Sequence, residues 1–429
     1  MYELRKSNER VLLIGIARSN RGRWRKIDEL QELAALAQTA GGSVVEKVIQ
    51  IRPDLNPATL LGKGKVAELK ELCQQHKIDL LIFDETLTGS QVRNLEEATG
   101  VRVIDRTTLI LDIFARHARS AEARTQVELA QLEYRSSMLT GHGIEMSQPG
   151  GGTRGGIGTI GPGETKLEID RRRIRERIAR LKTELARIDK ERAVQRQARA
   201  QDLRIAIAGY TNAGKSTLMN RLTDAGVKVA PELFATLDSN TKVLVLNRSL
   251  KGYLTDTVGF IRNLPHELVT GFRSTLSEVR EADLILHVVD AASSDAELMI
   301  EAVQGTLKEI GVEAKPVIMV FNKTDRVFEP ARLERLQRQW PGSVAVSAMT
   351  GDGIDRLKQA ILDWLACRLV TRVFTIPASR GDLMSRLFNA GEILRSDVAG
   401  EKLRLRVKGY PASLARVRLE IKNALRARR

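Results

Sequence analysis

The sequence predicts a multidomain α/β protein, and three observations carry this prediction. The chain has 429 residues, enough for about three domains. Apolar runs of strand length alternate with helix-length segments over most of it. One strand–helix junction holds the octapeptide Gly-Tyr-Thr-Asn-Ala-Gly-Lys-Ser, residues 209–216, which matches the pattern of a phosphate-binding loop. We expect an N-terminal α/β domain, a helical hairpin, a P-loop domain and a small C-terminal α+β domain.

The composition indicates a polyanionic partner. Lys and Arg total 69 against 53 Asp and Glu, a net charge of +16, which is typical of proteins that bind nucleic acid. No run approaches the ~18 apolar residues of a membrane span. Cys73 and Cys367 stand apart, without the spacing of a zinc site or a disulfide framework. We expect a monomeric, cytoplasmic protein and leave loose membrane association open.

Residues 1–107 alternate strands and helices, as expected of a domain built on a parallel sheet. The predicted strands are 10–17, 42–51, 79–84 and 101–105, and the predicted helices lie near 25–40, 64–76 and 89–98. The turn Gly62-Lys63-Gly64-Lys65 opens the second of these helices. We interpret it as a basic helix start; a second nucleotide site and an RNA phosphate contact are the alternatives.

Residues 108–200 have a different character. A helical arm from about Leu109 to Leu139 leads into residues 141–163, whose ten glycines exclude a helix or a paired strand. A second arm follows, with the heptad seam Ile174, Ile178, Leu181, Leu185 and Ile188. Residues 170–199 carry twelve Arg or Lys against five Asp or Glu. We predict an antiparallel basic hairpin whose glycine-rich tip contacts RNA; a solvated coiled coil is the alternative.

Residues 201–369 form the predicted P-loop domain. The octapeptide follows the apolar run 203–208 and precedes a helix-like segment, which is the context that the loop needs. Gly209 and Gly214 let successive N–H groups point at phosphate oxygens, and the start of the helix adds its positive end. We expect Lys215 to reach the β- and γ-phosphates and Ser216 to offer its hydroxyl to Mg²⁺.

A second motif specifies the base. Asn322-Lys323-Thr324-Asp325 follows the apolar run 316–321. Asp325 would accept hydrogen bonds from guanine N1–H and the exocyclic amine. Adenine lacks this pair of donors, so ATP would lose roughly 10²-fold in affinity. Asn322 would face the base or brace the loop, and Lys323 would lie along the ring. Ser347-Ala348 follows another short strand and fits the loop that closes over guanine O6 through a backbone N–H.

Two further segments suit switches that sense the γ-phosphate. Asp256-Thr257-Val258-Gly259 ends a strand, and Asp256 is the expected water-mediated Mg²⁺ carboxylate. The backbone N–H of Gly259 would sense the γ-phosphate. Thr236 is the candidate for a second hydroxyl on Mg²⁺. The next residue after the glycine is Phe260, which cannot orient the attacking water as glutamine does, so we expect slow intrinsic hydrolysis. His287, in another apolar strand run, is interpreted as a core histidine.

Residues 370–429 form a small basic tail domain in this prediction. Strand-like runs at 373–377 and 402–409 alternate with helices at 379–392 and from 413 onward. Between 401 and 429, ten basic residues stand against two acidic ones. We expect a second RNA-contacting surface here, with solubilising charge as the alternative.

Several blocks of the sequence resemble the HflX family of ribosome-associated GTPases. They are VIDRTTLILDIFARHA (103–118), GGIGTIGPGETKLEIDRR (155–172), GYTNAGKST (209–217), LFATLD (233–238), DTVGFIRNLPHELV (256–269) and NKTD (322–325). The resemblance covers nearly the whole chain. It implies a GTPase that hydrolyses GTP to GDP with Mg²⁺ and binds the large ribosomal subunit near the peptidyl transferase centre. It also implies stimulation by the ribosome, and splitting or rescue of stalled ribosomes, notably under heat stress.

By motif match, the predicted catalytic residues are Lys215, Thr236 and Gly259, and the predicted Mg²⁺ ligands are Ser216, Thr236 and Asp256. The predicted nucleotide-binding residues are Gly209, Tyr210, Thr211, Asn212, Ala213, Gly214, Lys215, Ser216, Thr217, Phe234, Ala235, Thr236, Leu237, Asp238, Asp256, Thr257, Val258, Gly259, Asn322, Lys323, Thr324, Asp325, Ser347, Ala348 and Met349. Three alternatives stay open: a ribosome-assembly GTPase, an ATP-driven RNA-remodelling enzyme with a second N-terminal nucleotide site, and a non-ribosomal scaffold or protease regulator.

Overall fold

The computed structural model describes residues 9–140, 166–197, 203–223, 233–234, 240–246, 251–262 and 278–426. Two compact units divide the chain, the first holding most of residues 1–188 and the second most of 189–429. The predicted hairpin tip and the predicted residues Ala235, Thr236, Leu237 and Asp238 lie outside the described residues. Among the described helices, none combines the length and the hydropathy that a bilayer crossing requires.

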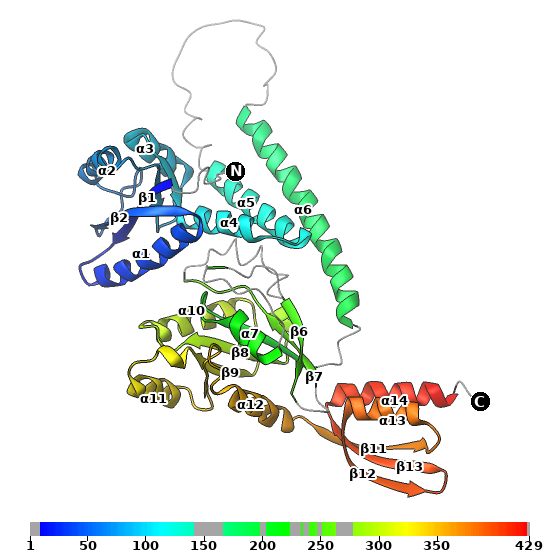
Figure 1. Cartoon of the computed structure of the whole chain (residues 1–429). Coiled ribbons are helices and arrows are strands. Elements are labelled where there is room, and N and C mark those ends of the chain that lie inside the picture. The colour runs from blue at the N-terminus through cyan, green and yellow to red at the C-terminus, as the bar shows by residue number, and fades with distance from the viewer. Residues whose placement is uncertain are drawn as a thin grey trace, which may run out of the picture. The chain divides into compact units, whose positions relative to one another are not determined.

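The first unit is built on a four-stranded sheet with strand order β2-β1-β3-β4 (Figure 1). All pairs in it are parallel, as predicted. The inner strands β1 and β3 are almost entirely buried, which is typical of a parallel sheet with both faces covered. The strands are β1 Glu9–Ala17, β2 Gly42–Ile51, β3 Leu80–Phe83 and β4 Arg102–Asp105, and the connecting helices are α1 Gly22–Thr39, α2 Lys63–Gln75 and α3 Gly89–Thr99.

The first helical arm of the predicted hairpin is two helices rather than one. Helix α4 spans Arg106–His117 and α5 spans Ala121–Thr140. The backbone is extended at Ala118, and Ser120 Oγ then caps the new helix by accepting a hydrogen bond from Ala123 N at 3.0 Å. The expectation of one helix was wrong because neither proline nor glycine marks this break in the sequence.

Helix α6, Lys166–Gln197, confirms the heptad seam. Between residues 172 and 191, the five seam residues are the ones that are buried or half-buried, and Leu181 is only 1% exposed. Ion pairs join α6 to α5 at Arg177–Glu128 (2.7 Å) and Lys182–Glu133 (2.8 Å), and the two helices run in opposite directions (Figure 1). The antiparallel pairing of the two arms is therefore present.

The second unit contains a six-stranded sheet with order β10-β9-β8-β5-β7-β6. Only β6 runs antiparallel to its neighbour; the other pairs are parallel. The carboxyl ends of β5, β7 and β9 therefore meet at one edge, where ligands bind in sheets of this kind. The strands are β5 Leu203–Gly209, β6 Asn240–Val245, β7 Lys251–Asp256, β8 Leu284–Asp290, β9 Val317–Asn322 and β10 Val344–Ala345, and the helices are α7 Lys215–Thr223, α10 Ala296–Glu309, α11 Pro330–Gln339 and α12 Ile354–Ala366, with a short 3₁₀ turn at Thr324–Arg326.

The chain ends in a three-stranded antiparallel sheet of order β11-β13-β12, with both helices of this domain on one side (Figure 1). Strand β12 was not predicted, because most of its residues are exposed and its sequence shows no clear alternation. The elements are β11 Val370–Pro377, α13 Gly381–Ala390, β12 Gly391–Ala399, β13 Lys402–Gly409 and α14 Pro411–Arg426. The predicted fold class is confirmed; the four domain boundaries remain a prediction.

Candidate nucleotide site

The loop 209–216 runs from β5 into α7 and packs tightly against its neighbours. A Cβ atom added at Gly209 would clash with the carbonyl oxygen of Val288. At Gly214, where φ is +90°, a Cβ atom would clash with the side-chain amide of Asn322. Both positions therefore require glycine, the residue that lets the backbone of such a loop turn its N–H groups toward a phosphate.

Lys215 is the buried cation of this loop. Its side chain is largely enclosed, and Nζ donates a hydrogen bond to the carbonyl oxygen of Tyr210 at 2.9 Å. Burial lowers the pKa of Lys215 to about 8, an effect that Asp256 opposes and Lys323 reinforces. A nearby anion restores the charged form of such an amine, so the environment suits a phosphate group.

An oxygen donor set for Mg²⁺ lies beside this lysine. Ser216 Oγ donates a hydrogen bond to Asp256 Oδ2 at 2.6 Å, and Asp256 is fully buried. Hydroxyl and carboxylate oxygens are ligands that Mg²⁺ prefers. Thr211 Oγ1 is buried and has no hydrogen-bond partner among the described residues. An orphaned hydroxyl next to the glycine cradle and the lysine amine fits a phosphate group or its water.

Asn322 braces two loops, the second of the roles predicted for it. Its Nδ2 donates to the carbonyl oxygen of Ala213 at 2.9 Å, and its Oδ1 accepts from Ala348 N at 3.0 Å. The N–H predicted to meet guanine O6 is thus engaged by Asn322 in this structure. Asp325 Oδ1 accepts from Ser347 Oγ at 2.6 Å, which orients the carboxylate expected to hold the base.

Phe260 lies against the phosphate-binding loop. It is 2% exposed, and its backbone forms a parallel bridge with Tyr210. Phe260 N donates to the carbonyl oxygen of Gly209 at 3.1 Å, and its carbonyl oxygen accepts from Thr211 N at 2.7 Å. An apolar side chain fixed here offers no hydrogen bond to a water, in agreement with the sequence.

Sequence reasoning missed two supports of the site. Lys323 Nζ pairs with Asp290 Oδ2 at 2.8 Å, and Arg221 Nε donates to the carbonyl oxygen of Ala348 at 3.2 Å. Asp290 could have been found, because it is the polar residue that ends the apolar strand β8. Arg221 carries no such pattern. The side chain of Met349, predicted to bind the nucleotide, is exposed.

His287 is the buried histidine of the second unit. It stands on β8 opposite Ala208 of β5 and is 1% exposed, as expected of a core histidine. Neither ring nitrogen has a hydrogen-bond partner among the described residues. Burial, followed by the charge of Lys215, lowers the pKa of His287 to about 4. The imidazole is therefore neutral at physiological pH.

Phe234 is the only one of the predicted nucleotide-binding residues 234–238 that lies within the described residues. Its ring meets Phe114 edge-on, with centroids 4.6 Å apart, and both belong to the first unit. Its side chain is buried in this packing. Its role in nucleotide binding remains a prediction.

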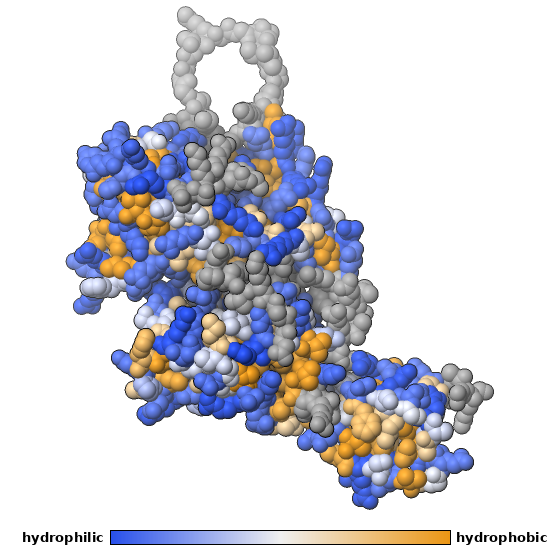
Figure 2. All heavy atoms as spheres, viewed as in Figure 1, coloured by the Kyte–Doolittle hydropathy of each residue, from blue (hydrophilic) through white to orange (hydrophobic). Residues whose placement is uncertain are grey.

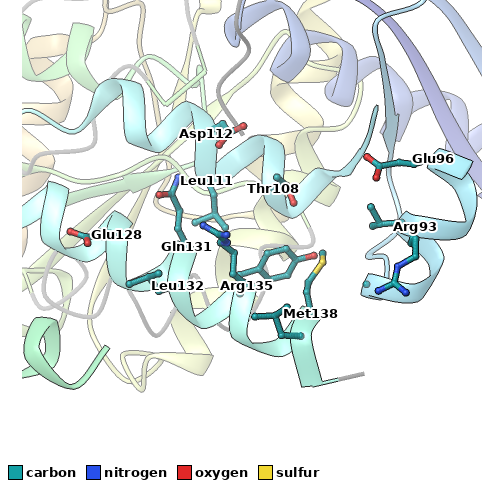
Figure 3. Close-up of a pocket in the computed structure, with 14 residues that line it drawn as sticks. Arg93, Glu96, Thr108, Leu111, Asp112, Glu128, Gln131, Leu132, Arg135 and Met138 are labelled. Atoms are coloured by element: carbon teal, nitrogen blue, oxygen red, sulfur yellow. The ribbon is translucent and has the colours of Figure 1, made fainter. Parts of the chain in front are cut away.

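A cavity of about 460 Å³ lies between α3, α4 and α5 (Figure 3). Its described lining does not include the turn 62–65 that was considered for a second nucleotide. At that turn, Gly62 N donates to Gln50 Oε1 at 3.0 Å and Lys65 pairs with Glu68 at 2.7 Å. Three carboxylates share the cavity with two arginines, which does not suit a triphosphate. These five residues are Glu96, Asp112, Glu128, Arg93 and Arg135.

The sequence of this chain matches known proteins. Three family descriptions match: "GTP-binding GTPase N-terminal" over residues 27–115, "GTP-binding GTPase Middle Region" over 117–199 and "50S ribosome-binding GTPase" over 204–323. A GTPase HflX of Caldanaerobacter subterraneus is 43% identical over 429 residues, which cover 99% of this chain and 95% of that protein. The chain belongs to the HflX family of GTPases. As an HflX GTPase, it binds GTP and GDP with Mg²⁺ and hydrolyses GTP.

This HflX chain is also similar to other proteins. The GTPase HflX of Escherichia coli K12 is 42% identical over 366 residues, which cover 84% of this chain and 85% of that protein. A GTP-binding protein of Sulfolobus solfataricus, crystallised in complex with GDP, is 26% identical with a TM-score of 0.43; the match covers 82% of this chain and 98% of that one.

Proposed function

We propose that this HflX GTPase is a nucleotide-dependent switch that acts on the large ribosomal subunit in the cytoplasm and splits or rescues stalled ribosomes under stress. The observation that carries the proposal is the loop 209–216, with its two required glycines and its buried Lys215, beside a buried Phe260. A site that binds GTP without orienting the attacking water hydrolyses it slowly, so it needs a partner that completes it.

The charge distribution supports a partner rich in RNA. Helix α6 buries its seam against α5 and leaves its basic residues in solvent, and hydrophilic atoms cover most of this helix in the view of Figure 2. The exposed cations Arg172, Arg173, Arg175, Arg177, Arg180, Lys182, Arg187 and Lys190 stand along it. Cations on a long exposed helix can follow a phosphate backbone. A family description that names a 50S ribosome-binding GTPase points to the same partner.

The described residues supply binding and charge compensation for GTP. Lys215 and the N–H groups of the loop 209–216 would hold the β- and γ-phosphates. Ser216, Asp256 and the predicted Thr236 would hold Mg²⁺, which when bound offsets the charge that develops on the phosphate oxygens. Asp325, oriented by Ser347, would accept the guanine donors.

Purified large ribosomal subunits should raise the GTP turnover of this chain at least ~10-fold, because the subunit would complete the site at Phe260. Turnover is measured as phosphate release with and without subunits. Lys215→Ala should abolish the stimulated rate, since it removes the cation that compensates the phosphates, and small subunits should not stimulate. An equal rate with and without large subunits would contradict the proposal.

A further inference from the structure

The C-terminal three-stranded sheet has one covered face and one open face. Helices α13 and α14 bury the inward residues of its strands, among them Phe374 on β11 and Leu405 and Val407 on β13. Both helices lie on the same side (Figure 1). Alternate residues of a strand point to opposite faces. The residues between those buried positions of β13 therefore form the open face.

A row of four cations runs along the open face of the central strand. They are Lys402, Arg404, Arg406 and Lys408, the first three exposed and the last half-buried. Residues two apart in a strand are about 7 Å apart, a separation comparable with that of successive phosphates in an extended nucleic acid strand. In the part of the chain that the structure describes, none of the four makes an ion pair or a side-chain hydrogen bond. The row therefore has its charge available for a ligand.

One cross-strand pair on this face is unfavourable for the stability of the sheet. Arg406 stands directly opposite Arg395 of β12, and like charges in that relation destabilise a sheet. Asp397, which stands opposite Arg404, makes an ion pair with Arg395 on its own strand at 2.9 Å. Glu392 stands opposite Lys408, so the four cations face two acids of β12, yet no ion pair joins these acids to the row among the described residues. The cationic row is thus better explained by a partner than by the fold.

We infer that this open face is an RNA-binding platform that contacts the phosphate backbone. On the adjoining strand β11, small or aliphatic residues face the row: Thr371 opposite Lys408, Val373 opposite Arg406 and Thr375 opposite Arg404. They leave a strand of RNA room to approach. Phe374, the sole aromatic residue of these three strands, is buried on the covered face. Without an exposed aromatic ring for base stacking, recognition is through phosphates and is insensitive to sequence.

The inference extends the proposed function, since the RNA offered to this face on a ribosome is ribosomal, but it can be tested apart from it. Arg404→Gln/Arg406→Gln in the full chain is compared with the matched control Arg418→Gln/Lys422→Gln, which removes two exposed cations from α14 of the same domain. Binding of a single-stranded oligouridine is measured at several salt concentrations. The sheet variant should lower the slope of log affinity against log salt by about 1.4, near 0.7 for each lost phosphate contact.

The control variant should leave that slope unchanged, and the sheet variant should unfold no more readily than the wild type, because it relieves a like-charge pair. Oligouridine carrying 4-thiouridine should crosslink to residues of β11 and β13 on irradiation. Equal salt slopes for the two variants, or crosslinks confined to other parts of the chain, would overturn the inference. So would a loss of binding to anionic phospholipid vesicles without a loss of binding to oligouridine.

Large ribosomal subunits separate this inference from the proposed function. If the wild type does not bind large subunits in any nucleotide state, the proposed function fails. The oligouridine-binding and crosslinking measurements would still show whether the sheet binds RNA. If the wild type and both variants bind subunits and oligouridine equally, the platform is refuted and the proposed function stands. Weaker binding of the sheet variant alone, in both assays, is the result that we expect.

Discussion

At the scale of single residues, the side chain of Asn322 connects two loops of the nucleotide site. One amide joins the phosphate-binding loop, through Ala213, to the loop that follows β10, through Ala348. The tetrapeptide that contains it was identified from the sequence by its place after a strand. The sequence could not show whether Asn322 contacts the base or braces the loops. That depends on its two partners, Ala213, which is 109 residues away in the sequence, and Ala348, which is 26 residues away.

Asp325→Asn should lower GTP affinity at least ~100-fold, because an amide N–H would face the guanine donors in place of an accepting oxygen. The same variant should gain affinity for xanthosine triphosphate, whose base carries an oxygen where guanine carries the amine. Titration with fluorescent nucleotide analogues measures both. Ser347→Ala, which removes only the 2.6 Å brace on the carboxylate, should cost less, about 10-fold. Unchanged GTP affinity in Asp325→Asn would exclude this residue from base recognition.

His287 makes stability depend on pH. Its pKa is about 4 in the folded chain against an ordinary 6.5, so between these values the unfolded chain binds more protons. The unfolding free energy therefore falls as pH falls through this window, by about 2 kcal/mol at pH 5. In urea titrations at pH 7 and pH 5, His287→Leu should lose less stability on acidification than the wild type by about that amount. An equal pH dependence of the two proteins would be inconsistent with a buried neutral imidazole.

At the scale of elements, patterns that repeat were predictable and isolated breaks were not. The parallel strands of the first unit, the seam of α6 and the strand–loop–helix around Lys215 follow from periodicity and motif. The break between α4 and α5 depends on one capping serine, Ser120. Strand β12 pairs with β13 along its length, but most of its side chains are exposed. Its sequence therefore shows little alternation of apolar and polar residues.

Two glycine-to-alanine substitutions separate a required turn from a tolerant helix. Gly214→Ala places a Cβ atom against the Asn322 amide at a φ of +90°, so it should lower GTP affinity at least ~10-fold. Gly305→Ala, inside α10 and with open space around the added atom, should raise stability by about 1 kcal/mol and leave GTP affinity unchanged. Nucleotide titration and urea unfolding of both variants check the pair. Equal affinities would mean that the loop tolerates a side chain at Gly214.

At the scale of the whole molecule, a GTP site is combined with basic surfaces in both units. Most of the net charge of +16 belongs to the sequences of α6 and of the C-terminal domain. For such a chain to act as a switch, the nucleotide must change the affinity of these surfaces for their partner. Couplings between sites in proteins are typically 1–3 kcal/mol, or about 5- to 150-fold in affinity. The effect is therefore large enough to measure directly.

Sedimentation with purified large ribosomal subunits tests the central claim most directly. The chain is loaded with a non-hydrolysable GTP analogue or with GDP, and the bound fraction is measured over a range of subunit concentrations at fixed salt. The account predicts at least ~10-fold tighter binding in the GTP-analogue state, within the usual range of such couplings. Equal binding in the two states, or no binding in either, would contradict it.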